Sequence, residues 1–175
     1  MNIPIGSKAV PAIVLCALSA AAAAERGQAR LQSTQEGAGL SGTVRLEETK
    51  GGLRIDAEIT QAPPGKHGFH IHEFGVCDNR GESAGTHYNP DKHAHGDLLK
   101  QGLSKTHAGD FGNIDVDSTG QGSFHAEVKG LSLNGNKHPV AGRAFIVHEQ
   151  PDDFGQPTGN AGKRIACGPI LVVKD

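Results

Sequence analysis

Hydrophobic and polar residues alternate with a period of two along much of the chain. Residues 40–47 place apolar or small side chains at every second position, and residues 53–60 repeat the pattern. Successive side chains of a strand point to opposite faces, so this alternation predicts half-buried β-strands. The pair Gly51 and Gly52 between the two stretches favours a hairpin turn.

Six further stretches predict strands, at residues 29–33, 68–72, 113–117, 122–128, 144–148 and 164–173. The 25 glycines and nine prolines are concentrated between these stretches, and the sequence contains no convincing long helix or internal repeat. About eight short strands with turn residues between them are typical of an all-β sandwich or barrel.

Two connections are long for a compact β domain, residues 74–106 and residues 150–163. Long ordered loops usually carry function. Four histidines lie in or beside the first loop, at positions 87, 93, 95 and 107, and His148 ends the strand that enters the second. We therefore expect these two loops to build the functional site.

The first residues of the chain have the composition of an export signal. Lys8 lies in a short polar start, residues 9–23 are apolar, and residues 22–24 are three alanines suited to cleavage. The apolar run is shorter than the roughly 18 residues of a membrane span. A lipoprotein signal at Cys16 is disfavoured because Leu15 precedes it. The sequence predicts a cleavable secretory signal peptide over residues 1–24 and one domain over residues 25–175.

Charge and aromatic content narrow the possible partners. The formal net charge is −2, aromatic residues make up 4%, and Trp is absent. This composition argues against binding to nucleic acid or to an anionic membrane surface. The mature chain keeps two cysteines, Cys77 and Cys167, and a pair of cysteines in an exported domain is expected to form one disulfide.

His70 and His72 lie two residues apart on a predicted strand, so both point to one face while Phe69 and Ile71 point to the other. The face with Phe69 and Ile71 would pack against the core, and the face with His70 and His72 would coordinate a metal. Alone, the pair could equally be two surface histidines. Together with the loop histidines, His148 and Asp110, it suggests a zinc or copper site, since imidazole donors suit these metals.

Five ordered motifs resemble those of the copper,zinc superoxide dismutases, at residues 65–73, 83–90, 107–110, 142–153 and 159–168. The first reads Gly-Lys-His-Gly-Phe-His-Ile-His-Glu and the last reads Gly-Asn-Ala-Gly-Lys-Arg-Ile-Ala-Cys-Gly. The resemblance covers nearly all of residues 25–175. It implies an eight-stranded antiparallel Greek-key β-barrel or sandwich with two long functional loops.

The resemblance also implies one copper and one zinc per subunit. The copper ligands by matching position are His70, His72, His87 and His148. The zinc ligands are His87, His95, His107 and Asp110, and the zinc would be structural. A deprotonated imidazole can bind a metal through each ring nitrogen, which explains a histidine at the shared position. In this family His87 would also act catalytically, as a proton relay.

Three further roles follow from the resemblance. Asp152 would tie the outer nitrogens of His70 and His95 together and couple the two metals. Arg164 would act catalytically beside the copper and orient a small anion with its guanidinium. His67 would support the site without binding metal. Among the loop histidines, the eight-residue spacing from His87 favours His95 over His93 as the ligand.

The implied enzyme is a superoxide dismutase, an oxidoreductase that converts superoxide into oxygen and hydrogen peroxide for antioxidant defence outside the cytoplasm. It would be periplasmic or secreted, and a homodimer, with a monomer as the alternative. Cys77 comes early in its loop, as in bacterial members. Residues 153–160 form a short segment without the Lys and Glu that guide substrate in animal members, so steering by that segment is in doubt.

Two other classes of function stay open on the sequence. A secreted copper-binding or copper-delivery module would keep the fold without turnover, although the retained copper ligands together with Arg164 and Asp152 count against it. A zinc hydrolase is disfavoured because no Glu is placed as a general base beside an open zinc position.

Overall fold

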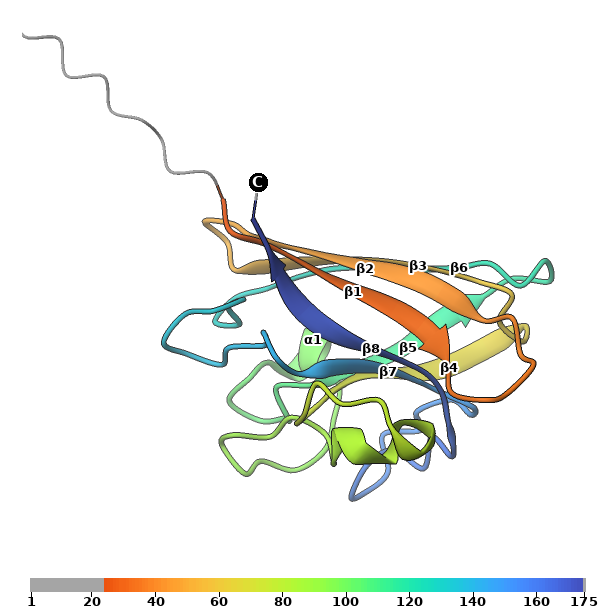
Figure 1. Ribbon diagram of the computed structural model, residues 1–175. Helices are drawn as coiled ribbons and strands as arrows, with labels where there is room; N and C mark the ends of the chain where they lie inside the picture. The colour runs from red at the N-terminus through yellow and green to blue at the C-terminus, as the bar shows by residue number, and fades with distance from the viewer. Residues whose placement is uncertain (1–23, 175) are drawn as a thin grey trace, which may run out of the picture.

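The computed structural model describes residues 24–174, which form a closed barrel of eight antiparallel strands (Figure 1). The strands run in the spatial order β1-β2-β3-β6-β5-β4-β7-β8. Their bounds are Arg26–Ser33 for β1, Ser41–Glu48 for β2, Leu53–Thr60 for β3, Gly65–His72 for β4, Asp110–Val116 for β5, Gly122–Val128 for β6, Ala144–His148 for β7 and Arg164–Val173 for β8. The predicted all-β architecture of eight strands is confirmed.

Two of the strand pairings join strands that are not consecutive in the sequence, so the chain crosses over between them. β3 is hydrogen-bonded to β6, and β4 is hydrogen-bonded to β7, so neighbours in space are not neighbours in the chain. This is the Greek-key arrangement that the resemblance implies. Some strands begin earlier than the alternation predicts. β5 begins at Asp110, and this places a carboxylate on the end of the strand.

The barrel interior is filled by aromatic and aliphatic side chains. Phe69 stacks on Phe145 with ring centroids 5.0 Å apart, and the rings of Phe111 and Phe124 also pack against Phe69. Phe69 and Ile71 of β4 face this core, as the alternation predicts. Every residue from His67 to His72 is nevertheless buried, because loops cover the outer face of β4 as well.

The connections after β4 and after β7 provide that cover (Figure 1). The first carries a short 3₁₀ helix, Asn79–Ala84, and a one-turn helix, α1, at Leu98–Gln101. The second, residues 149–163, pairs with β4 where Gly68 donates its N–H to the carbonyl of Gln150. A disulfide between Cys77 and Cys167 fastens the first connection to β8.

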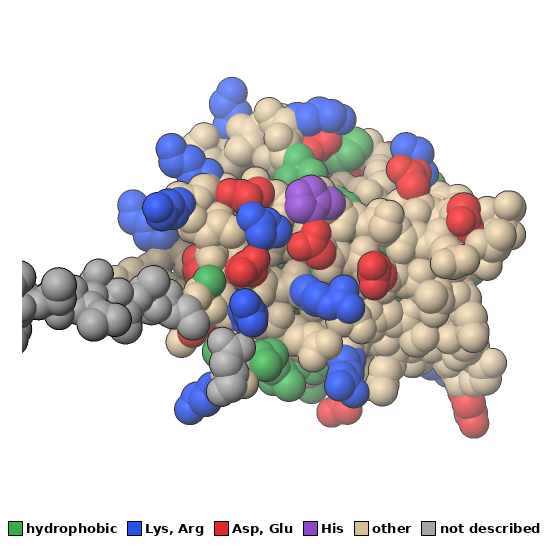
Figure 2. Space-filling model, turned by 90° about the horizontal axis from the view of Figure 1, so that it is seen from above, with side chains coloured by type: hydrophobic (Ala, Val, Ile, Leu, Met, Phe, Trp, Pro, Cys, Tyr) green, Lys and Arg blue, Asp and Glu red, His purple; other side chains and the backbone are tan. Residues whose placement is uncertain are grey.

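The outer face of the opposite half of the barrel carries charges of both signs. Figure 2 shows acidic and basic side chains interspersed over this face. Arg54 bonds Glu47 at 2.8 Å across β2 and β3, and Arg45 lies 3.4 Å from Glu58. This face therefore presents no continuous field of one sign.

Within residues 24–174, no helix is long and apolar enough to cross a membrane. The predicted leader, residues 1–24, lies outside the described residues except for Ala24.

Candidate metal centre

Four buried histidines bring their ring nitrogens together on the outer side of β4. One nitrogen of each lies within 4.8 Å of those of the other three, in the group His70, His72, His87 and His148. β4 supplies His70 and His72, and β7 supplies His148 as its last residue. His87 comes from the first long connection, where its backbone forms a β-bridge with His72.

The rings of His72 and His148 present unprotonated nitrogens to each other. His72 Nδ1 lies 3.0 Å from the carbonyl oxygen of Gly85, and His148 Nδ1 lies 3.2 Å from that of Gly162. A carbonyl only accepts, so each Nδ1 carries the hydrogen and each Nε2 keeps a lone pair. The two Nε2 atoms are 3.3 Å apart. Two facing lone pairs fit a shared cation.

Burial keeps these rings neutral. It lowers the pKa of His72 well below its usual value, helped by the neighbouring His87, and it lowers the pKa of His148 to about 3. The low dielectric of the site disfavours the charged imidazolium. Neutral imidazole is the form that binds metal, so the group is prepared for a cation at neutral pH.

His70 adds a nitrogen with no partner. Its Nε2 lies 2.8 Å from a carboxylate oxygen of Asp152, and its buried Nδ1 has no hydrogen-bond partner among residues 24–174. A buried acceptor left unpaired costs about 1–3 kcal/mol. A bound metal would remove that cost. A set made only of imidazole nitrogens suits copper, so these residues fit a copper ion.

A second buried group surrounds the carboxylate of Asp110. Its Oδ1 lies 2.8 Å from His87 Nδ1 and 3.1 Å from His107 Nδ1, and its Oδ2 lies 2.9 Å from His95 Nδ1. The backbone N–H groups of Gly96 and His107 donate to Oδ2 and hold the carboxylate in place. Three imidazoles thus converge on one carboxylate.

This second donor set fits zinc. His95 Nδ1 is buried and makes no hydrogen bond within the described chain, even though Asp110 Oδ2 is close, because the two do not meet in hydrogen-bonding geometry. A nitrogen and a carboxylate oxygen oriented in this way fit a common ion. Three imidazoles with one carboxylate make a four-donor set of the kind that zinc takes.

The carboxylates of the site are held ionised. Burial alone would raise the pKa of Asp110, but the adjacent imidazoles of His107, His87 and His95 outweigh burial and hold that pKa far below the usual range. For His95, burial lowers the pKa, but the nearby carboxylates of Asp110 and Asp152 outweigh burial and raise this pKa to about 9. Paired opposite charges explain both directions.

His87 belongs to both groups. Its ring centroid lies 4.1 Å from that of His70, while its Nδ1 faces Asp110. Burial lowers the pKa of His87 to about 4, against the opposing effect of Asp110. One ring therefore offers Nδ1 to the second group and Nε2 to the first.

Asp152 connects the outer nitrogens of the two groups. Its Oδ2 lies 2.8 Å from His70 Nε2 and its Oδ1 lies 3.0 Å from His95 Nε2. Burial raises the pKa of Asp152, but the bonds to the two imidazoles more than offset this and lower it. A carboxylate that accepts from both rings fixes their tautomers and orientations.

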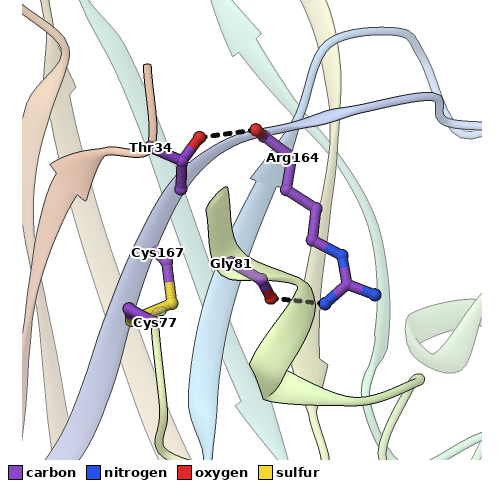
Figure 3. The surroundings of a disulfide bond; sticks show 5 residues. All are labelled: Thr34, Cys77, Gly81, Arg164 and Cys167. Atoms are coloured by element: carbon purple, nitrogen blue, oxygen red, sulfur yellow. Dashed lines mark hydrogen bonds between the residues drawn. A yellow bond between two sulfur atoms is a disulfide. The ribbon is translucent and has the colours of Figure 1, made fainter. Parts of the chain in front are cut away.

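Arg164 lies at the start of β8 (Figure 3), and its charge acts on His72 and His148 of the first group. Its Nη1 donates to the carbonyl of Gly81 at 2.5 Å and its Nη2 donates to that of Gly85 at 2.7 Å. Thr34 Oγ1 donates to the Arg164 carbonyl at 2.6 Å. The Cys77–Cys167 disulfide anchors the segment that carries Gly81. The guanidinium is thus held in one orientation.

An open cavity of about 940 Å³ leads to Arg164. Its walls include Arg80 and Lys163 as further cations and Glu36, Glu82 and Glu149 as anions. Glu82 Oε2 lies 3.4 Å from Arg164 Nη2. The cationic and the carboxylate side chains that line this cavity are therefore equal in number.

Two histidines of the region lie outside both groups. His67 is buried, with its ring nitrogens 2.8 Å from the carbonyl oxygens of His148 and Pro63. His93 Nδ1 lies 2.9 Å from the carbonyl oxygen of Leu103. Two side chains that brace the site, Asn113 and Gln156, carry no signal in the sequence, because both bind backbone groups across loops.

An antiparallel barrel with two buried histidine groups that share one imidazole defines a two-metal β-barrel protein. Residues 40–170 match the family model for copper/zinc superoxide dismutase. The chain belongs to the copper/zinc superoxide dismutase family.

Curated relatives agree with this membership. The chain is 38% identical over 143 residues to an extracellular superoxide dismutase [Cu-Zn] of Caenorhabditis elegans, covering 78% of this chain and 63% of that protein. It is 35% identical over 143 residues to the corresponding protein of Brugia pahangi, covering 76% and 70%. The chain thus spans slightly less than two thirds of the first of these proteins.

A solved structure shares the fold. The crystal structure of the clock protein EA4 superposes with a TM-score of 0.76 at 32% sequence identity, covering 89% of this chain and 99% of that one.

Proposed function

We propose that this protein is a secreted superoxide dismutase, which converts two superoxide anions and two protons into oxygen and hydrogen peroxide. The observation that carries the proposal is the pair of buried donor groups joined through His87. The family membership supports the same reaction. The antioxidant role outside the cytoplasm follows from that reaction together with the predicted leader.

We assign copper to His70, His72, His87 and His148, and zinc to His87, His95, His107 and Asp110. The unpartnered Nδ1 of His70 and the facing Nε2 atoms of His72 and His148 support the copper assignment. Copper, when bound, supplies the one-electron redox chemistry, and zinc supplies structural support. One ion of each kind per chain matches the two donor groups.

The chain's own side chains bind and protonate the reactants. Arg164 presents a fixed guanidinium to an anion that enters the cavity, and its orientation comes from the carbonyls of Gly81 and Gly85. His87 would serve as the proton relay, holding a proton at Nε2 in the state in which that nitrogen is not a metal ligand and passing it to the anion in the cavity. Asp152 keeps the rings of His70 and His95 in their tautomers, and His67 braces the backbone at His148.

One preparation tests this function. The metal content of the purified mature protein is measured by mass spectrometry, and superoxide consumption is followed with and without cyanide, a copper ligand. We expect one copper, one zinc and cyanide-sensitive turnover. Copper without turnover would indicate a copper-delivery module, and zinc without copper would indicate a hydrolase, and either result would contradict the proposal.

We propose that residues 1–24 are removed on export and that the mature domain begins at Glu25, in the periplasm if the source is a Gram-negative bacterium. The extracellular naming of the two relatives supports secretion. The N-terminal sequence of the exported protein, determined by mass spectrometry after fractionation, tests this. A retained leader would contradict it.

We propose a homodimer as the assembled form, with the monomer as its alternative. Exposed apolar side chains support this, since Phe74, Val76 and Leu171 are 55%, 43% and 64% exposed. The backbone at Gly75 lies against Gly142, which in turn bonds β8, so these side chains come from adjoining segments. The mass in solution by light scattering, for wild type and Phe74→Glu, distinguishes the two forms.

A further inference from the structure

Gln156 binds the backbone of His95 at both of its polar groups. The His95 N–H donates to Gln156 Oε1 at 3.1 Å, and Gln156 Nε2 donates to the His95 carbonyl at 2.8 Å. A primary amide has one acceptor and one donor side by side, so it reproduces the paired bonds of two antiparallel strands. The Gln156 side chain thus makes the two hydrogen bonds to His95 that the backbone of a neighbouring strand would make.

His95 depends on this contact because its segment has no regular structure. Residues 91–97 form neither helix nor strand, and the hydrogen bonds that the structure shows to the His95 backbone within residues 24–174 are the two from Gln156. The ring is held separately, at Nε2 by Asp152. Backbone and ring are therefore anchored by two residues of the same connection, residues 149–163.

Amide side chains brace neighbouring positions in the same manner. Asn89 pairs with the backbone of His93, at 2.9 and 3.0 Å, within the first connection. Asn113 of β5 pairs with the backbone of Asp152, at 3.0 and 2.7 Å. Gln156 differs from both because it joins the two long connections to each other at a residue of the second donor group.

A second contact supports the same junction. Phe154, two residues before Gln156, stacks on the His95 ring with centroids 6.5 Å apart and an interplanar angle of 20°. Lys100 Nζ lies over the Phe154 ring, 5.8 Å from its centroid. The short segment 153–160 therefore closes over the His95 loop.

We propose that Gln156 is a positioning residue for the zinc site, which fixes the His95 backbone so that Nδ1 stays aligned with Asp110. Segment 153–160 thereby acts as a brace for a metal ligand, whatever its part in substrate steering. The inference rests on the zinc assignment made above. Partners one layer outside a metal typically change its affinity by about 10- to 100-fold, and we expect Gln156 to fall in that range.

Two substitutions test this inference. Gln156→Leu removes both hydrogen bonds at similar size. Gln156→Glu keeps the acceptor for the His95 N–H but turns an oxygen toward the His95 carbonyl. The matched controls are Gln150→Leu and Gln150→Glu, because Gln150 lies exposed in the same connection. We expect both Gln156 variants to release zinc to a competing chelator at about 10-fold lower chelator concentration, with copper content unchanged.

Cobalt(II) in place of zinc gives a readout of ligand alignment. We expect the visible absorption of the cobalt-loaded Gln156 variants to shift and weaken, while the Gln150 controls keep the wild-type spectrum. A role confined to bracing the loop would lower the stability of the metal-free protein without changing the cobalt spectrum or the zinc release. That result would overturn the inference.

The outcome for wild type separates the two proposals. Wild type that takes up one zinc, with Gln156 variants that hold it equally well, contradicts the role of Gln156 alone. Wild type that takes up no zinc contradicts the zinc assignment itself, and the inference falls with it.

Discussion

His72 and Arg164 donate to the same carbonyl oxygen, that of Gly85. His72 Nδ1 lies 3.0 Å from it and Arg164 Nη2 lies 2.7 Å from it. The ring of a copper-group residue and the guanidinium that faces the entering anion are thus positioned by one backbone atom. Gly85 follows the 3₁₀ helix in the segment that the Cys77–Cys167 disulfide anchors. The disulfide therefore helps to position both His72 and Arg164.

The disulfide should contribute strongly to stability. Cys77 and Cys167 are 90 residues apart, and the chain-entropy model assigns such a closure about 4 to 5 kcal/mol. We expect Cys77→Ala with Cys167→Ala to lower the unfolding free energy by an amount approaching this value. Urea unfolding of the metal-free protein measures it. A midpoint equal to wild type would contradict the prediction.

The same double substitution should lower turnover, because the carbonyls of Gly81 and Gly85 lose their anchor and the Arg164 guanidinium loses its orientation. The comparison is made at matched copper content. Full activity in the doubly substituted protein would mean that the segment keeps its position without the disulfide.

The stability of the metal-free protein should fall in acid. The native pKa is about 4 for His87 and about 3 for His148, and it is also lowered for His70 and His72, against 6.5 in the unfolded chain. Below about pH 6.5 the unfolded chain therefore binds more protons, and unfolding becomes easier as the pH drops. Each fully differing group contributes about 1.4 kcal/mol per pH unit.

His95 acts in the opposite direction on the alkaline side. Its native pKa of about 9 lies above 6.5, so its contribution is complete below pH 6.5 and is lost as the pH rises through 9. The contribution of His95 therefore does not offset the stability that the metal-free protein loses in acid. Urea midpoints of the metal-free protein at pH 7 and pH 4.5 test the prediction, and a midpoint at pH 4.5 equal to or above that at pH 7 would disprove it.

Asp110→Ala should remove zinc while most of the copper stays. Asp110 contacts His87, His95 and His107 and belongs to the second donor group alone. We expect zinc affinity to fall by more than about 10-fold, the smaller loss seen for residues outside the first ring of ligands. Each tenfold loss of affinity lowers the unfolding free energy of the zinc-loaded protein by about 1.4 kcal/mol.

Asp115→Ala is the matched control, since Asp115 lies on the same strand with a 71% exposed side chain paired to Lys66. Metal content is measured for both variants. Equal loss of zinc and copper in a well-folded Asp110→Ala protein would show that the ligands are divided wrongly.

The sequence predicts the strands well because their period of two is local, as in residues 53–60, which match β3 at both ends. It also separates Phe69 and Ile71 from His70 and His72 by face. The start of β5 at Asp110 cannot be predicted from the alternation, because Asp110-Phe111-Gly112 does not alternate and the pairing of Asp110 with His70 is long-range.

Contacts made through the backbone cannot be predicted from side-chain type alone. Gln156 resembles any polar loop residue until the fold brings it to His95, and the shared Gly85 carbonyl belongs to a residue without a side chain. The five family motifs contain every donor residue except His95, which its spacing from His87 indicates. The partners that orient those donors depend on loop conformation and emerge only with the three-dimensional structure.

Arg164 can act on the anion in two ways, by attraction over distance and by direct contact. Its side chain is 13% exposed and bound to two carbonyls, so its charge is fixed at the cavity. We expect Arg164→Ala to lower turnover by about 10-fold or more without loss of copper, and Arg164→Glu to lower it further by reversing the charge. Arg164→Lys should recover part of the rate, because a single ammonium cannot bridge both carbonyls.

Ionic strength distinguishes the two contributions. Screening acts over about 8 Å at physiological salt, so the difference between Arg164→Ala and Arg164→Glu should shrink as salt is added, while the loss due to contact with the bound anion persists. Arg45→Ala is the control, since Arg45 pairs with Glu58 on the outer face of β2. Rates are measured against salt at matched copper content. If all Arg164 variants keep the wild-type rate, Arg164 only braces its loop and has no part in guiding superoxide.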